Sequence, residues 1–217
     1  MIPQTVILAT RNQGKVRELR SILSASGFDV QPLPENFPGI EETGCTFEEN
    51  ALIKAHAVAE RLGLPSIADD SGLEVDALGG APGVYSARYG DDIPLLEGES
   101  RDGRNNRKLL AQMEGVEDGM RGARFRCCMA FVRPGEDDIV ACGSWEGRIL
   151  RTPSGSNGFG YDPLFLDPEM GMTGAEMTRE QKSARSHRGK AVRSLLEKMA
   201  ARQAKGCPPK EPRKECS

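Results

Sequence analysis

The first chemical feature of the sequence is a polar loop, Thr10–Lys15, between an apolar segment and a helix-like one. A loop that opens a helix offers free backbone N–H groups, the positive end of the helix dipole and, here, the ammonium group of Lys15. Together these suit a phosphate group. The loop is not a Walker A motif, because only the Gly14-Lys15 pair matches that pattern and Val16 follows. An ordinary strand–helix turn with a solvated lysine explains the loop equally well.

Two adjacent carboxylates, in Asp69-Asp70-Ser71-Gly72, lie at the end of a predicted strand. Neighbouring residues in a strand point to opposite faces, so a ligand shared by Asp69 and Asp70 would require a turn here. Two carboxylates ~4 Å apart repel by ~4 kcal/mol at an effective dielectric constant of about 20, and a divalent cation or a lysine removes that penalty. Oxygen ligands beside a phosphate substrate favour Mg²⁺ over zinc. An acidic turn or a helix N-cap is the alternative.

Other charged side chains could complete such a site. Glu41-Glu42 could supply a further metal carboxylate or could belong to a solvated acidic loop. Lys54 lies about one helical turn past Asn50, so the two side chains point the same way. Lys54 could therefore reach a phosphate or a carboxylate, although most lysines on helices are simply exposed.

Two later segments could hold a nucleobase. In the glycine-rich loop 156–162, Phe159 could stack on a flat base and Asp162 could accept a hydrogen bond from a ring N–H. The alternative is that the aromatic residues of this loop fill the core. The segment Lys182–Arg188 is dense in donors, and His187 and Arg188 could donate to a keto group; a solvated charged face is the alternative.

Strands and helices must alternate to position these residues. The apolar patterning predicts strands over 5–9 and 66–68, helices over 15–24 and 104–113, a last helix within 184–203, and a hairpin over 123–133 and 138–146. Thr46 and Glu49 form a capping box, which predicts a helix that ends at Gly63. Alternating strands and helices with one hairpin predict an α/β fold with a mixed sheet.

Length and composition narrow the class of protein. The 217 residues suit one large α/β domain or two small lobes. The formal net charge of −3 gives no global field that would favour nucleic acid or an anionic membrane. We find no apolar run that could cross a bilayer and no secretory signal. We therefore expect a cytoplasmic protein whose six cysteines are reduced.

Five stretches, taken together and in this order, resemble the inosine triphosphate pyrophosphatase family, also called the Ham1-like or non-canonical purine NTP pyrophosphatases. The stretches are LATRNQGKVREL, EETGCTFEENALIKA, ADDSGLEVDALGGAPGVYSARY, GFGYDPLF and TREQKSARSHRGKA. They span nearly the whole chain, from Leu8 to Ala191. Arg11 departs from the family, which often has a small residue there, and this difference could alter access to the loop.

The resemblance implies an α/β fold of the Ham1/Maf type, also described as anticodon-like nucleotide-binding. Such a fold has a long, bent mixed β-sheet flanked by helices, and two lobes with a central cleft. The resemblance also implies a homodimer and one pyrophosphatase domain over residues 1–204. The tail 205–217 contains three prolines and alternating charge, which predicts disorder.

The resemblance also implies roles for single residues. Asp70 would be the general base and an Mg²⁺ ligand, with Glu42 as the other metal carboxylate and Glu41 as the fallback. Lys54 and Asp69 would complete a charged floor. The residues that would contact substrate are Thr10, Arg11, Asn12, Gln13, Gly14, Lys15, Lys54, Ser71, Phe159, Gly160, Tyr161, Asp162, Lys182, His187 and Arg188.

The implied reaction is hydrolysis of ITP, dITP and XTP to the nucleoside monophosphate and pyrophosphate, with Mg²⁺ as cofactor. Donors from His187 and Arg188 would suit the 6-keto group of these purines and would disfavour the 6-amino group of adenine. One alternative is a Maf-like pyrophosphatase acting on canonical pyrimidine nucleotides, against which the Ser-His-Arg segment argues. Another is a non-catalytic nucleotide or nucleic-acid binding module. Net acidity and the lack of an aromatic–basic stripe disfavour nucleic acid.

Overall fold

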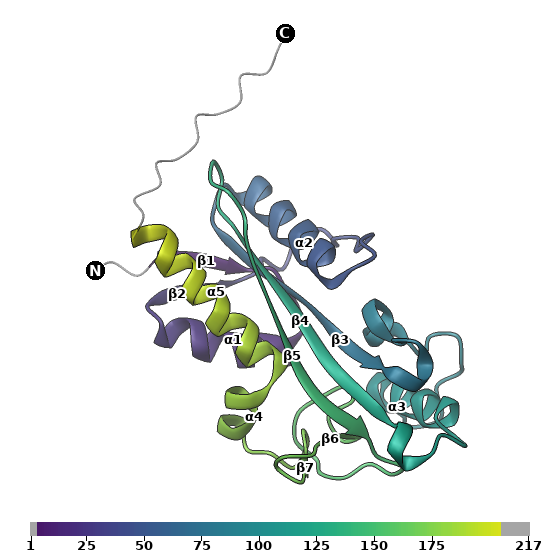
Figure 1. Cartoon of the computed structure of the whole chain (residues 1–217). Coiled ribbons are helices and arrows are strands. Elements are labelled where there is room, and N and C mark those ends of the chain that lie inside the picture. Colours follow the sequence, from purple (N-terminus) through teal and green to yellow (C-terminus); the bar gives the residue numbers. More distant parts are fainter. Residues whose placement is uncertain (1–3, 205–217) are drawn as a thin grey trace. The chain divides into compact units, whose positions relative to one another are not determined.

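The structure is a computed structural model that describes residues 4–204. Its strands are β1 (Gln4–Leu8), β2 (Phe28–Pro32), β3 (Ser66–Val75), β4 (Gly122–Val132), β5 (Ile139–Ile149), β6 (Phe165–Asp167) and β7 (Met172–Thr173). They form one sheet in the order β2-β1-β3-β4-β5-β6-β7 (Figure 1). β1 pairs in parallel with β2 and β3, whereas β6 pairs antiparallel with β5 and β7. The predicted α/β class and mixed sheet are therefore confirmed.

The chain divides into two compact units. Among the described residues, the first unit contains 4–70, 128–142 and 191–204, and the second contains 71–127 and 143–190. β3, β4 and β5 contribute residues to both units. The single functional domain over residues 1–204 stays a prediction. The tail 205–217, which we expected to be disordered, lies outside the described residues.

In the first unit, helices α1 (Gln13–Ala25) and α2 (Phe47–Leu62) pack on the sheet. Successive side chains along β1 point to opposite faces of the sheet. Ile7 packs with the alanine-rich side of α2, while Val6 and Leu8 point the other way. The small side chains of Ala51 and Ala55, both fully buried, allow α2 to lie close to the strands. This close packing brings the polar residues of α2 near the strand that follows it in the chain.

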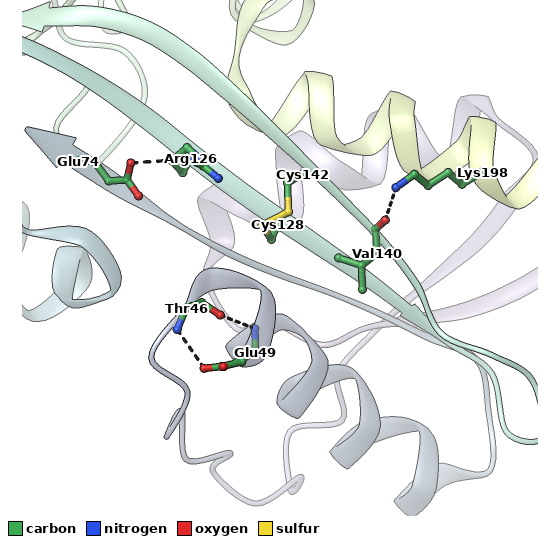
Figure 2. The surroundings of a disulfide bond; sticks show 8 residues. All are labelled: Thr46, Glu49, Glu74, Arg126, Cys128, Val140, Cys142 and Lys198. Atoms are coloured by element: carbon green, nitrogen blue, oxygen red, sulfur yellow. Dashed lines mark hydrogen bonds and ion pairs between the residues drawn. A yellow bond between two sulfur atoms is a disulfide. The ribbon is translucent and has the colours of Figure 1, made fainter. Parts of the chain in front are cut away.

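The predicted capping box of α2 is confirmed (Figure 2). Thr46 Oγ1 accepts a hydrogen bond from the N–H of Glu49 at 3.1 Å, and the Glu49 carboxylate accepts from the N–H of Thr46 at 3.2 Å. Gly63 ends the helix in the left-handed conformation, with φ 65°. A glycine takes this conformation without steric cost, which explains why the helix ends there.

The expectation that all cysteines are reduced is wrong for one pair. A disulfide joins Cys128 in β4 to Cys142 in β5, with the two Cα atoms 4.1 Å apart (Figure 2). The two residues are only 14 positions apart and lie on neighbouring strands of one hairpin, so strand pairing alone brings the sulfur atoms together. Cys45 and Cys127 are not part of a disulfide, and Cys207 and Cys216 lie outside the described residues.

The second unit has its own hydrophobic core, which includes Phe125, Trp145 and Phe165. The ring centroids of Phe125 and Phe165 are 4.5 Å apart, and Trp145 Nε1 donates to Asp167 at 2.9 Å. Helix α3 (Arg101–Gln112) begins at the N-cap Ser100. None of the helices formed by residues 4–204 has the length and apolar character needed to span a membrane.

The last helix predicted within 184–203 is confirmed as α5 (His187–Ala204), and a short helix, α4 (Arg179–Arg185), precedes it. Ser186 separates them because its backbone is extended, with φ −64° and ψ 155°. The break places His187 at the start of α5, where a continuous helix would have placed it within a turn.

Candidate active site

Asp69 and Asp70 lie within β3, which continues to Val75 instead of ending in the predicted turn. The turn is therefore wrong, and the two carboxylates point to opposite faces of the strand. A lysine meets each of them: Lys15 Nζ lies 3.0 Å from Asp69 Oδ2, and Lys54 Nζ lies 3.1 Å from Asp70 Oδ1. Each aspartate is thus compensated on its own face, and no turn is needed to relieve their repulsion.

Asp70 is the centre of a buried polar cluster in the first unit. It is 6% exposed, and its two carboxylate oxygens have different partners. Lys54 Nζ donates to Oδ1 at 3.1 Å, and Asn50 Nδ2 donates to Oδ2 at 3.2 Å. Lys54 Nζ also donates to Glu42 Oε1 at 3.2 Å. The ammonium group of Lys54 therefore joins Asp70 to the loop that precedes α2.

Burial and charge oppose each other in this cluster. Burial raises the pKa of Asp70; Lys54 and Lys15 act to lower it, Glu42 adds to the rise, and the pKa remains above its ordinary value. Burial alone would lower the pKa of Lys54, but the negative charges of Asp70, Asp69 and Glu42 outweigh it and the pKa is raised. Lys54 therefore stays charged at neutral pH. A carboxylate with a raised pKa is better suited to accept a proton than an ordinary aspartate.

The sequence left open whether Glu41 or Glu42 joins Asp70. The structure brings Glu42 to the Lys54 ammonium group, while Glu41 is exposed. Groups of three or more His, Cys, Asp or Glu residues arranged to hold a metal ion do not occur within 4–204. Two carboxylates that converge on one cation still suit Mg²⁺, because this ion usually takes one or two protein carboxylates and completes its shell with water and phosphate oxygens.

The loop Thr10–Lys15 follows the carboxyl end of β1. Ile7 and Leu8 pair with Ser66 and Ile67 of β3, and the N–H of Ala9 donates to Ile67 at 2.8 Å. The loop therefore begins level with the part of β3 that carries the two aspartates. The ion pair between Lys15 and Asp69 places the start of α1 there as well.

Part of the donor capacity expected of this loop is used internally. Asn12 is the N-cap of α1, and its Oδ1 accepts from the N–H groups of Gly14 at 2.9 Å and Lys15 at 3.2 Å. The N–H of Asn12 donates to Thr10 Oγ1 at 3.2 Å. Arg11 donates to the carbonyl oxygens of Glu35 and Phe37, so its guanidinium group braces a neighbouring loop. A phosphate that took the N–H groups of Gly14 and Lys15 would have to displace the Asn12 side chain.

In the second unit, the loop around Phe159 is organised by Asp162. Its Oδ2 accepts from the N–H of Phe159 at 2.8 Å and from Lys182 Nζ at 2.5 Å. Lys182 Nζ and the Arg188 guanidinium group lie 5.0 and 5.5 Å from the Phe159 ring centroid. The ring therefore has two cations close to it, and because Phe159 is half-buried it keeps part of its surface accessible.

Tyr161 is buried, unlike the half-buried Phe159. The family resemblance implied that Tyr161 contacts substrate, but the residue is 4% exposed and belongs to the core of the second unit. Its hydroxyl donates to the carbonyl oxygen of Ser86 at 2.8 Å. The neighbouring Gly160 is held by α3: its N–H donates to Asp102 at 2.7 Å, and its carbonyl oxygen accepts from Asn106 at 3.0 Å. Neither of these α3 residues was predicted from the sequence.

His187 and Arg188 are both buried at the start of α5. The His187 ring stacks on Phe125, with the centroids 4.8 Å apart and the planes 14° apart. Arg188 Nη2 donates to Ser71 Oγ at 2.9 Å. Ser71, Phe159 and Arg188, which the sequence analysis selected separately, are therefore neighbours in the second unit.

Comparisons with known proteins agree with one another. The sequence profile of the Ham1 family matches residues 6–198. A dITP/XTP pyrophosphatase from Nitratidesulfovibrio vulgaris is 58% identical over 200 residues, which are 91% of this chain and 96% of the relative. A dITP/XTP pyrophosphatase from Escherichia coli (strain K12) is 51% identical over 197 residues, 89% of this chain and 97% of the relative.

Solved structures give the same result. The Ham1 protein from Staphylococcus aureus superposes with a TM-score of 0.78 at 39% identity, covering 92% of this chain and all of its own. A nucleoside-triphosphatase / dITP/XTP pyrophosphatase from Mycobacterium abscessus gives 0.69 at 43% identity, covering 89% of this chain and 99% of its own. The profile match and these identities extend over nearly the whole described chain, so this protein belongs to the Ham1 family.

Proposed function

We propose that this chain hydrolyses the non-canonical purine nucleotides ITP, dITP and XTP to the nucleoside monophosphate and pyrophosphate. Relatives more than half identical to it are named for dITP and XTP. The observation that carries the proposal is the buried ammonium group of Lys54, which contacts Glu42 and Asp70 together. A site of this charge pattern can accept a divalent cation at the carboxylates and polyphosphate oxygens at the lysine.

The chemistry that follows is a direct displacement. A water molecule beside Asp70 attacks the α-phosphorus, Asp70 accepts the proton, and the bond to the bridging oxygen breaks so that pyrophosphate leaves. Glu42 and Asp70 would hold Mg²⁺, which when bound supplies positive charge to the phosphate oxygens. Lys15 and Lys54 contribute fixed positive charge along the triphosphate. The remaining phosphate contacts are assigned to the loop residues Thr10, Arg11, Asn12, Gln13 and Gly14.

The second unit supplies residues suited to a purine base. Phe159 offers an aromatic ring close to two cations, and one of them, Lys182, donates to Asp162. His187 and Arg188 are donors that match a 6-keto group. Buried donors discriminate strongly, because a base with the opposite pattern leaves them unsatisfied. Ser71 and Gly160 would complete the contacts, whereas we assign Tyr161 to support of the loop.

Replacing His187 by alanine should reduce the preference for ITP over ATP by about 10-fold or more, because a donor to the 6-keto group is lost. Measuring kcat/KM for both nucleotides tests this. Part of any loss could reflect the packing of His187 on Phe125, so His187→Gln, which keeps a donor, should retain more of the preference. An unchanged ITP/ATP ratio in the alanine variant would mean that other residues distinguish the bases.

Pyrophosphate release from a panel of nucleotides, with Mg²⁺ or with a chelator, tests the function as a whole. We expect release from ITP, dITP and XTP with Mg²⁺, little release from ATP, and none with chelator. Preferred hydrolysis of pyrimidine triphosphates would favour the Maf-like alternative, and binding without release would favour a non-catalytic module. The homodimer and the cytoplasmic location expected from the sequence stay predictions.

A further inference from the structure

Asn50 is a buried polar residue whose role the proposed reaction does not include. It is 1% exposed and lies on α2, one turn before Lys54. Asn50 Nδ2 lies 3.2 Å from Asp70 Oδ2, while Lys54 Nζ lies 3.1 Å from Asp70 Oδ1. Two donors from successive turns of one helix therefore hold the two oxygens of one carboxylate. Rotation of the Asp70 carboxylate about its terminal torsion would break both contacts.

The orientation of the Asn50 amide is fixed by the loop before α2. The N–H of Gly44 lies 2.8 Å from Asn50 Oδ1. Because a backbone N–H can only donate, the amide oxygen must face Gly44, and the NH₂ group is then directed at Asp70. The direction of the Asn50 amide is thus set by the backbone N–H of Gly44, which takes no part in the proposed reaction.

Gly44 is suited to this contact by its lack of a side chain. A Cβ atom added there would lie 2.7 Å from Asn50 Oδ1 and 2.7 Å from Glu49 Cβ. The loop can therefore approach the Asn50 amide only with glycine at this position. The same loop carries Glu42 two residues earlier, so its approach also brings Glu42 to Lys54.

We propose that Asn50 is a positioning residue that fixes the orientation of the Asp70 carboxylate for proton transfer; this inference rests on the proposed function. Asn50 does not need to touch substrate for this role. It acts through Asp70, so its removal should lower kcat and leave KM for the nucleotide nearly unchanged. A structural role alone would lower stability without this effect on kcat.

The chain contains a matched control in the second unit. Asn105 is 3% exposed on α3, and its Oδ1 accepts from the N–H of Gly90 at 2.7 Å, as Asn50 accepts from Gly44. Its Nδ2 donates to the carbonyl oxygens of Ser86 and Ala87, both at 3.3 Å. The two asparagines therefore have the same burial and the same glycine contact. They differ in the group that the NH₂ meets, a carboxylate for Asn50 and backbone for Asn105.

The experiment compares Asn50→Leu with Asn105→Leu, measuring kcat and KM for ITP with Mg²⁺ and the thermal unfolding temperature. Leucine keeps the shape of asparagine and removes the amide. For Asn50→Leu we expect kcat to fall about 100-fold with KM changed less than about 3-fold. Asn105→Leu should lower the unfolding temperature but change kcat less than about 3-fold. Should Asn50→Leu not fold, Asn50→Ala provides the second variant, because it removes the amide without adding apolar volume, and it should lower kcat in the same way.

A double-mutant cycle with Asp70→Asn separates this inference from the proposed function. If Asn50 acts through Asp70, adding Asn50→Leu to Asp70→Asn should cost less than about 3-fold further in kcat. Two results would overturn the positioning role and leave the role of Asp70 intact. One is a full fall of about 100-fold in kcat when Asn50→Leu is added to Asp70→Asn. The other is a kcat for Asn50→Leu as high as that of Asn105→Leu. If Asp70→Asn alone kept its activity, the proposed function would fail and this inference with it.

Discussion

Replacing Asp70 by asparagine should lower kcat for ITP by about 10³-fold to 10⁴-fold, because the variant loses the group that accepts the proton of the attacking water. Asparagine has nearly the same shape, but its NH₂ group must face a donor, because Lys54 Nζ and Asn50 Nδ2 each donate to one oxygen of the carboxylate. It cannot accept a proton at neutral pH, and it is a poorer ligand for a divalent cation. Steady-state kinetics with ITP and Mg²⁺ measures the effect. Activity within about 10-fold of the unchanged protein would remove Asp70 from the reaction.

The same substitution has two opposing effects on stability. Burial raises the pKa of Asp70, so the folded protein binds a proton at this group more tightly than the unfolded chain does. The stability from this group is fully present below the unfolded-state pKa and is lost as the pH rises through the folded-state pKa. At neutral pH asparagine removes the cost of burying the ionised group, but it also takes one carboxylate partner from the buried Lys54 ammonium group. We expect a lower unfolding temperature than that of the unchanged protein, so kcat is compared at a temperature at which both proteins are folded.

A control variant for Asp70→Asn is Asp92→Asn. Asp92 makes the same kind of contact, an ion pair with Lys108 at 2.7 Å, but its side chain is 65% exposed. The chemical change is identical and lies in the second unit, whereas the cluster around Lys54 belongs to the first. kcat should be unchanged in this variant. A loss of activity there comparable to that of Asp70→Asn would show that the assay responds to the loss of any aspartate.

Local sequence signals predicted the elements that carry the first unit's residues. The capping box at Thr46 and the glycine at Gly63 both act within one helix, and the structure confirms both. The loop at Thr10 and the helix after it were also predicted, because β-branched and amphipathic patterns are local. The role of Asn12 as an N-cap that takes two of the loop's N–H groups was not predicted.

Predictions that depended on distant partners were less successful. Asp69-Asp70-Ser71-Gly72 has the composition of a turn, yet the strand continues through it because lysines from two different helices meet the two faces. Neither pairing is visible in the local pattern. The disulfide between Cys128 and Cys142 likewise depends on the register of a hairpin, which the sequence did not define. The site residues were found mainly through the family resemblance, and Asn50 was noted only for its direction.

Replacing Lys54 by methionine should lower kcat/KM for ITP by about 10²-fold to 10³-fold, because a fixed positive charge near the transferring phosphoryl group is lost. Methionine keeps the unbranched stem and removes the ammonium group that joins Glu42 to Asp70. The raised pKa of Lys54 means that the unchanged protein keeps this charge at neutral pH. The matched control is Lys108→Met, which removes an ammonium group from a pair with the exposed Asp92 and should not change kcat/KM.

Lys54→Met should also be less stable than the unchanged protein in the absence of divalent cations, because it leaves buried carboxylates without the ammonium group of Lys54. Breaking a buried ion pair by removing one partner costs about 3–5 kcal/mol, whereas removing the Lys108 ammonium group from its pair with the exposed Asp92 should cost less. Urea unfolding in a chelator measures both. Mg²⁺ should then stabilise Lys54→Met more than the unchanged protein, since the ion restores positive charge beside Glu42 and Asp70. Equal stabilisation of the two proteins by Mg²⁺ would mean that the ion does not bind at these carboxylates.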